Sequence, residues 1–199
     1  MLGSHLLLAL AWVFYFLLHS LLAHMPVKNW FRNIMGSSFK YYRLVYSVIA
    51  IVLLLPPIYL LVAIPSLRFW NLTLWTGLPA GILTVVGLWG MIICLKKYVG
   101  STEGFRDLFY EGMKPELQLT GLHRYVRHPL YLSTFICLGG IFLFFPYLSC
   151  LISYLLIVLY VIIAIPLEEA KLIGLYGEAY RKYRKEVGTL FPKQVSIKQ

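Results

Sequence analysis

The stretch LYLSTFICLGGIFLFFPYLSCLISYLLIVLYVIIAIPL, residues 130–167, decides how this chain folds. It contains no charged side chain, and it is too long to be one helix across one bilayer, which needs about twenty residues. Pro146 divides it near the middle, and proline breaks a helix because it lacks an N–H group and clashes with the preceding turn. We therefore predict two membrane spans, residues 130–146 and 147–167, joined in a tight hairpin.

The whole chain has the composition of a membrane protein. Its 199 residues are 60% hydrophobic and 13% charged, and the mean hydropathy is +0.76, far above that of soluble domains. Three further apolar runs, residues 6–23, 44–64 and 78–95, each have about the length of a span. The first lacks a small-residue cleavage site, so we expect a retained helix and not a signal peptide. The sequence predicts an all-α integral membrane protein: one multi-pass membrane domain with about five transmembrane helices.

Lysine and arginine gather in alternate connections between the predicted spans. Lys28, Arg32, Lys40 and Arg43 lie between the first and second spans; Lys96, Lys97, Arg106, Lys114, Arg124 and Arg127 lie between the third and fourth; the others, apart from Arg68, follow the last span. The positive-inside rule then places the N-terminus outside and the long loop and the tail in the cytoplasm. The net charge of +10 is spread along these segments without a recognition motif for nucleic acid. We expect contact with the lipid bilayer and none with nucleic acid.

The segment GLHRYVRHPLY, residues 121–131, holds the densest cluster of titratable and aromatic side chains, and we call it the central turn. Pro129 fixes φ and pushes His128 out of the helical region, so Arg127 and His128 lie on a constrained turn before an apolar helix. Such a turn is expected to direct free backbone N–H groups and a helix dipole at a carboxylate or another anion. The alternative is that Arg127 and His128 only anchor the helix at the lipid headgroups.

The tail after the last span supplies a second polar cluster. Glu168 and Glu169 stand where a membrane helix emerges, in a chain that otherwise excludes acidic residues from its spans. The residues that share one face at helical spacing are Glu169, Leu172 or Ile173, Tyr176, Tyr180 and Tyr183, and Glu168 points elsewhere. We expect this helix to fold back over the central turn, so that residues 96–129 and 168–192 form a cytoplasmic cofactor pocket. The alternative is an amphipathic helix that lies on the bilayer with its basic residues toward lipid phosphates.

Fewer polar residues mark the N-terminal half. His19 lies in the first span near its cytoplasmic end, where it is either an interfacial histidine or a substrate contact. Residues 24–42 have a basic amphipathic character and are predicted to lie in the headgroup plane, with Arg43 at the same interface or in a polar cavity below it. The glycines of the third span predict close helix packing. Cys94, Cys137 and Cys150 lack the spacing of metal ligands and are expected to be buried packing residues.

Several motifs together resemble one known group of enzymes. They are Arg127-His128-Pro129-Leu130-Tyr131, the apolar hairpin, Glu168-Glu169 with Leu172, Tyr176-Gly177 with Tyr180 and Tyr183, and Phe191-Pro192. This combination, over roughly residues 118–192, resembles the isoprenylcysteine carboxyl methyltransferase superfamily of membrane methyltransferases. In the N-terminal half, HSLLA at residues 19–23 and YRLVY at residues 42–46 are similar to the branch of nurim and the methanethiol S-methyltransferases.

The resemblance implies S-adenosylmethionine as the cofactor, bound between the central turn and the emerging last span, with the substrate entering from the membrane. The cofactor contacts implied by position are Gln118, Leu119, Gly121, His123, Arg127, His128, Tyr131, Glu168 and Glu169. The candidate catalytic residues are Arg127 and Glu169, and the candidate substrate contacts are His19 and Arg43. The chain departs from the family at His123, where tyrosine is common, and at Glu186, where carboxyl methyltransferases carry a basic residue. An acid at that position disfavours a carboxylate substrate.

These observations predict an S-adenosylmethionine-dependent membrane methyltransferase of a small or lipophilic nucleophile, with a thiol favoured. The alternatives are carboxyl methylation of isoprenylcysteine, methylation of a lipid amine and, in another class, a non-catalytic membrane scaffold similar to nurim. A transporter is disfavoured because the spans hold almost no paired ionisable groups. No metal is expected, since methyl transfer from a sulfonium needs mainly alignment of the nucleophile and exclusion of water.

Overall fold

The computed structural model describes residues 2–99 and 117–193, apart from the side chains of residues 43 and 97–99. The helices of these segments are, in chain order, α1 (Leu2–Ala23), α2 (Met25–Met35), η1 (Gly36–Tyr41), α3 (Tyr42–Ala63), α4 (Leu74–Val99), η2 (Gly121–Arg124), α6 (Pro129–Phe144), α7 (Leu148–Tyr176) and α8 (Glu178–Glu186). In this part of the chain, strand pairing is limited to isolated bridges. The predicted all-α class is confirmed.

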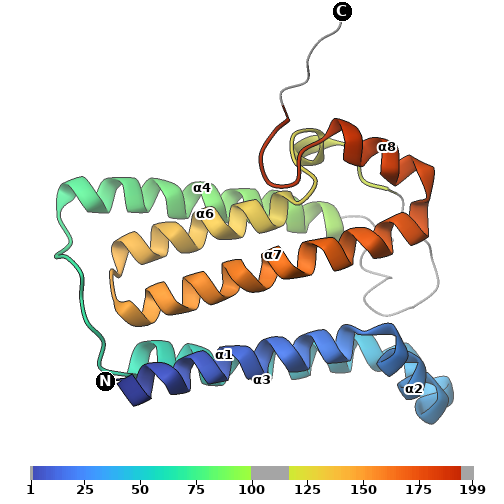
Figure 1. The fold of residues 1–199 in the computed structure, drawn as a ribbon, viewed down its shortest axis with the longest axis horizontal. Coiled ribbons are helices and arrows are strands. Elements are labelled where there is room, and N and C mark those ends of the chain that lie inside the picture. The colour runs from blue at the N-terminus through green and yellow to red at the C-terminus, as the bar shows by residue number, and fades with distance from the viewer. Residues whose placement is uncertain (1, 100–116, 194–199) are drawn as a thin grey trace, which may run out of the picture.

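The long helices lie side by side in one bundle (Figure 1). α4 and α6 form the most closely packed pair, α7 lies beside α6, and α1 with α3 covers the other side of α7. α2 and α8 lie at the same end of the bundle, and the N-terminus lies at the opposite end. The basic residues of α2 and α8 therefore share one end of the described structure.

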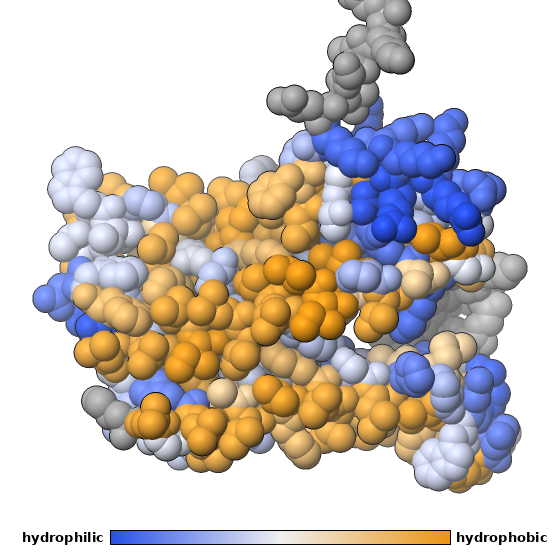
Figure 2. All heavy atoms as spheres, in the orientation of Figure 1, coloured by the Kyte–Doolittle hydropathy of each residue, from blue (hydrophilic) through white to orange (hydrophobic). Residues whose placement is uncertain are grey.

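Four helices of the described chain are long and apolar enough to cross a membrane. These spans are Leu2–Ala23, Leu44–Ala63, Leu74–Lys96 and Leu148–Tyr176, and α6 is a shorter apolar helix of 16 residues. Figure 2 shows apolar side chains along the length of the bundle and hydrophilic side chains gathered over α8 at one end. The chain is thus a multi-pass membrane protein, and the shorter apolar helix of the described residues, α6, is the one that follows the central turn.

The break predicted at Pro146 is present. α6 ends at Phe144, α7 begins at Leu148, and Pro146 is fully buried between them. The connection between α3 and α4 pairs with this hairpin, because the N–H of Phe69 donates to the carbonyl of Pro146 at 2.8 Å and the N–H of Leu148 donates to the carbonyl of Leu67 at 2.9 Å. These backbone groups therefore find their partners within the protein, which an apolar environment requires.

The segment predicted to lie in the headgroup plane forms α2 and η1. α2 buries none of its residues, and the large apolar side chains of Trp30 and Ile34 are 59% and 62% exposed. The guanidinium of Arg32 lies over the ring of Phe39, 4.7 Å from its centroid. Exposed apolar and basic side chains on one short helix are typical of an interfacial helix, and its depth in the bilayer stays a prediction.

Glycines bring α4 and α6 into close contact. A Cβ atom on Gly87 would lie 2.6 Å from the Cα atom of Cys137, and one on Gly90 would overlap a serine hydroxyl of α6. From the other side, a Cβ atom on Gly140 would lie 2.8 Å from the carbonyl oxygen of Ala80. Real Cβ atoms essentially never approach so closely, so the two backbones leave no room for a side chain. The predicted packing role is confirmed at Gly87 and Gly90.

Replacing Gly87 by alanine should destabilise the bundle, because the added methyl group would overlap backbone atoms of α6. We expect a loss of about 1–3 kcal/mol in the free energy of unfolding, measured on detergent-solubilised protein. Gly81→Ala is the matched control in the same helix, since its Cβ atom would lie 3.7 Å from the Phe144 ring, an ordinary contact. Equal stability of the two variants would contradict the close approach of α4 and α6.

Candidate active site

The tail returns to the central turn and pairs with its backbone. The N–H of Arg127 donates to the carbonyl of Gly188 at 2.8 Å, and the N–H of His128 donates to the carbonyl of Thr189 at 3.1 Å. Val126 and Gly188 form a parallel bridge beside them. The expectation that this turn offers free backbone N–H groups to a ligand is therefore wrong for Arg127 and His128. Their partners, the carbonyls of Gly188 and Thr189, lie some sixty residues further along the chain, and no local sequence pattern predicts this pairing.

A break at Gly177 turns the tail back. Gly177 has a φ of +59°, a conformation that favours glycine, and it separates α7 from α8. The continuous helical face predicted from Glu169 to Tyr183 is therefore wrong. The tyrosines nevertheless reach the turn: Tyr180 and Tyr183 are buried, and the Tyr183 hydroxyl donates to the carbonyl of His123 at 2.7 Å. The tail thus folds over the central turn as predicted, by a different route.

Arg127 ties the central turn to α7 and to the tail. Its side chain is buried, with Nε 2.8 Å and Nη2 2.7 Å from Glu169 Oε1. Nη2 also donates to the hydroxyl of Thr189 at 2.7 Å, and Nη1 donates to the carbonyls of Arg184, at 3.1 Å, and Val187. Those two carbonyls lie at the end of α8, where the helix itself offers no partner. Every guanidinium nitrogen is engaged inside the protein, so the geometry favours a positioning role for Arg127.

Glu169 is the buried acceptor of this network, with 5% of its side chain exposed. Besides Arg127, its Oε1 atom lies 3.3 Å from His128 Nε2, and its Oε2 atom lies 3.0 Å from Arg184 Nε. A buried carboxylate is tolerated only when it is paired and hydrogen-bonded. Two guanidinium groups and an imidazole meet that requirement, and both carboxylate oxygens are used within the protein.

Glu168, which directly precedes Glu169 in α7, contacts the same turn. The Tyr131 hydroxyl donates to Glu168 Oε2 at 2.8 Å, and His128 Nδ1 lies 3.7 Å from that oxygen. The expectation that Glu168 points elsewhere is wrong, because the His128 ring lies between the two carboxylates with one nitrogen toward each. The Glu168 side chain is 43% exposed, and Oε1 has no hydrogen-bond partner within residues 2–99 and 117–193. This carboxylate is therefore accessible, whereas Glu169 is not.

Tyr180, which the sequence predicts only as part of an aromatic wall, also contributes a polar atom to the site. The residue is 2% exposed, and its hydroxyl makes no hydrogen bond of good geometry with any described residue. Burial, reinforced by the negative charge of Glu169 and partly opposed by Arg127, raises the pKa of Tyr180 to about 12. The phenol is thus neutral at physiological pH and presents a buried donor and acceptor beside the ion pair.

The other predicted cofactor residues lie in η2 and in the segment before it. Gln118 is half-buried and Leu119 is 45% exposed in the segment before η2. Gly121 opens η2 with a φ of +68°, which explains a glycine at this position, and His123 is buried. Their contact with a ligand stays a prediction.

His19, one of the two candidate substrate residues, lies away from the carboxylates of Glu168 and Glu169. His19 lies among aromatic side chains, with the Tyr46 hydroxyl 3.0 Å from Nδ1 and the Tyr160 ring edge-on at 6.5 Å between centroids. Tyr160 precedes Glu168 on α7 by two helical turns, roughly 12 Å along the axis. The side chain of Arg43 lies outside the described part of the structure. Both substrate roles stay predictions.

Replacing Arg127 by alanine should strongly destabilise the fold, because the Glu169 carboxylate stays buried without its main partner. We expect a loss of about 3–5 kcal/mol in the free energy of unfolding. Adding Glu169→Gln to that variant should recover part of the loss, since the uncompensated charge is removed. Arg181→Ala is the control, because its ion pair with Glu178 is exposed on both sides. A loss no larger for Arg127→Ala than for Arg181→Ala would show that the buried pair does not hold the tail.

Comparison with known proteins places this site in a family. A model described as phospholipid methyltransferase matches residues 75–179, slightly more than half of the chain. The matched segment includes α4, the central turn, α6, α7 and both glutamates. No solved structure gives a significant match.

Curated relatives carry methyltransferase names. Methanethiol S-methyltransferase of Pseudomonas deceptionensis is 27% identical over 187 residues, which cover 87% of this chain and 67% of the relative. The enzyme of the same name from Crocosphaera subtropica is 32% identical over 90 residues, 44% of this chain and 33% of the relative. Protein-S-isoprenylcysteine O-methyltransferase of Schizosaccharomyces pombe is 37% identical over 73 residues, 36% of this chain and 31% of the relative. The chain thus aligns with about a third of the length of the latter two.

These names confirm the predicted resemblance to the isoprenylcysteine carboxyl methyltransferase superfamily and its methanethiol S-methyltransferase branch. Because the family model covers both the helical hairpin and the clustered glutamates, the chain belongs to the phospholipid methyltransferase family of enzymes.

Proposed function

We propose that this protein is an S-adenosylmethionine-dependent membrane methyltransferase whose methyl acceptor is a small or lipophilic thiol. The observation that carries the proposal is the pair of glutamates on either side of His128, one neutralised by arginine and one accessible. This cluster lies at one end of an apolar bundle, where a ligand from water and a ligand from the bilayer can meet. Membership of a methyltransferase family supports the same reaction class.

The residues of the site fit the charges of the proposed cofactor. S-adenosylmethionine carries an ammonium, a carboxylate and a sulfonium, and when bound it supplies an electrophilic methyl group for transfer to a nucleophile. Glu168 is the proposed partner of the ammonium, because its carboxylate is accessible and Tyr131 orients it by a hydrogen bond. The His128 ring stacks on Tyr131 at 5.5 Å between centroids and supplies an aromatic surface. The Tyr180 hydroxyl is a further proposed contact, which its lack of a well-placed partner supports.

Arg127 and Glu169 take a different role from the one first expected for them. Since each is saturated by contacts inside the protein, we propose that they position His128 and Glu168 and do not touch the reacting atoms. Gln118, Leu119, Gly121 and His123 keep their proposed place along the cofactor, on the strength of the family resemblance. His19 and Arg43 remain proposed substrate contacts.

A thiol is the proposed acceptor for two reasons. Several relatives of this chain are named for methanethiol, and Glu186 lies exposed at the end of α8, where an acid would repel a substrate carboxylate. A thiol reacts as its thiolate, so the proton leaves to water and the methyl group joins sulfur as a thioether. The second candidate is a prenylcysteine carboxylate, which the relative from Schizosaccharomyces pombe favours.

We further propose that the site faces the cytoplasm and that the N-terminus lies outside. The support is the gathering of α2 and α8, both rich in basic residues, at the end of the bundle opposite the N-terminus (Figure 1).

Binding of S-adenosylhomocysteine, measured by calorimetry on detergent-purified protein, should depend on Glu168. We expect Glu168→Gln to weaken binding more than tenfold, about 1.4 kcal/mol or more, because a neutral amide loses the charge-assisted bond to the ligand ammonium. Glu178→Gln is the matched control, since it makes the same change at an exposed acid of α8. We expect it to bind as the wild type does.

Two results would count against these assignments, and they differ. If the wild-type protein gives neither heat nor a thermal shift at millimolar ligand, the enzyme proposal fails. If the wild type binds and Glu168→Gln binds equally well, only the role of Glu168 fails.

Turnover of apolar thiols should rise with the length of their alkyl chain until the substrate fills the space that the protein offers it. Each buried methylene contributes about 0.8 kcal/mol, so kcat/KM should rise about fourfold for each added carbon. The assay offers alkyl thiols, alcohols of matched length and a farnesylcysteine analogue together and follows the methyl group into thioether, ether or ester. We expect thioether. Exclusive ester formation would overturn the thiol assignment and leave the methyltransferase assignment in place.

A further inference from the structure

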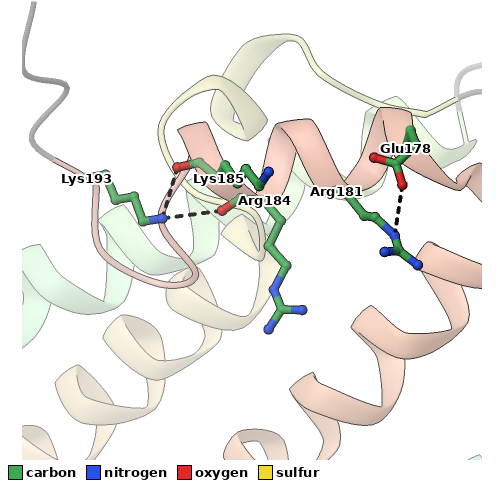
Figure 3. A pocket seen from close by; sticks show the side chains of 5 residues that line it. All are labelled: Glu178, Arg181, Arg184, Lys185 and Lys193. Carbon is green, nitrogen blue, oxygen red and sulfur yellow. Dashed lines mark hydrogen bonds and ion pairs between the residues drawn. The ribbon is translucent and has the colours of Figure 1, made fainter.

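A hollow of about 410 Å³ lies against α8, outside the cluster around Glu169. The side chains that line it are Glu178, Arg181, Arg184, Lys185 and Lys193, and Figure 3 shows them along the helix and the segment that follows it. The Lys193 ammonium donates to the carbonyls of Arg184 at 3.3 Å and Lys185 at 3.0 Å. These bonds fix a cation from the returning chain beside the end of the helix.

The lining has four cationic side chains and one carboxylate, an excess of positive charge among the described residues that form the hollow. Glu178 is paired with Arg181 at 3.4 Å. Arg184 uses Nε for Glu169, which leaves its terminal nitrogens for another acceptor, and Lys185 has no ion pair within the described residues. Forked guanidinium groups and ammonium groups at short range are the donors that recognise phosphate oxygens.

We propose that this hollow binds the phosphate of an anionic phospholipid headgroup. α8 follows directly on the membrane-spanning α7, so its basic face lies at the level where lipid headgroups are found. Phe191, two residues before Lys193, is 78% exposed, and Leu175, before the break at Gly177, is 40% exposed. Exposed apolar side chains that come before and after the lining residues in the chain fit a ligand that brings acyl chains with its phosphate.

The hollow is separate from the proposed cofactor site. It shares only Arg184 with the cluster around Glu169, and its positive charge disfavours a ligand that carries a sulfonium and an ammonium. The lipid proposal therefore does not rest on the proposed reaction, and it holds or fails whether or not the protein methylates anything.

The test uses the full chain in neutral detergent, titrated with short-chain phosphatidylglycerol, with bound lipid counted by native mass spectrometry. Arg181→Gln with Lys185→Gln removes two lining cations and spares Arg184, which contacts the active site. Each cation near a lipid surface contributes about 1 kcal/mol, so we expect roughly thirty-fold weaker binding. Lys171→Gln with Lys182→Gln removes two exposed cations of α7 and α8 that do not line the hollow, and it should bind as the wild type does.

Further arms identify the ligand. Short-chain phosphatidylcholine, which has a phosphate but no net charge, should bind at least tenfold more weakly than phosphatidylglycerol. Glycerol phosphate, offered at the same concentration, should fail to displace the lipid. Equal binding by the two double variants would overturn the site, and full displacement by glycerol phosphate would overturn the lipid as its occupant. Unchanged thermal unfolding of the lining variant would show that a lost site does not reflect a lost fold.

Discussion

The buried ion pair between Arg127 and Glu169 is the interaction on which the polar end of this molecule depends. Removing a carboxylate and a guanidinium from water is costly, and the cost is recovered only when every donor and acceptor is satisfied. Here satisfaction requires three parts of the chain at once: the central turn, α7 and the segment after α8. Each of the three segments supplies partners for the buried charges, so each depends on the other two for its position. The active-site end therefore forms as a unit, around charges that the apolar spans exclude.

This arrangement gives two neighbouring glutamates opposite properties. Glu169 is enclosed by Arg127, Arg184 and His128, whereas Glu168 keeps an unused oxygen and much of its surface. His128 lies between them and shares the two carboxylates through its two ring nitrogens. An acid that is already neutralised can order its surroundings, and an acid that is not can attract a cation. The buried Glu169 thus orders the site and the exposed Glu168 is available to a ligand, although the two residues are adjacent in the chain.

Much of this architecture could be predicted from the sequence, and the part that could not has a common cause. Apolar run lengths and Pro146 predicted the helices and the hairpin, because those are local properties of the chain. The motif around Arg127 and His128, with Glu169, predicted that the tail would fold over the central turn, whereas Glu168 was expected to point elsewhere. The backbone pairing of the turn with Gly188 and Thr189 could not be predicted, since hydrogen bonds between distant segments leave no periodic trace.

The helix break at Gly177 was also not predicted, although the sequence contains a feature that indicates it. A glycine that follows a tyrosine at the end of a long helical pattern is a common helix terminator. The even spacing of tyrosines through that point favoured a continuous helix instead. The break turns α8 back toward Glu169, and the ion pair of Arg184 with Glu169 was not predicted because it depends on that turn.

The shortness of α6 has a consequence for the membrane itself. Sixteen residues rise roughly 24 Å, several ångströms less than a typical hydrocarbon core of about 30 Å, while its neighbours α4 and α7 are far longer. Local thinning of the bilayer around the short helix is one of the ways in which such hydrophobic mismatch is relieved. Thinning at the end where α6 begins would lie immediately after His128. It would bring the water boundary closer to the central turn and shorten the distance between a ligand in water and a ligand in the bilayer.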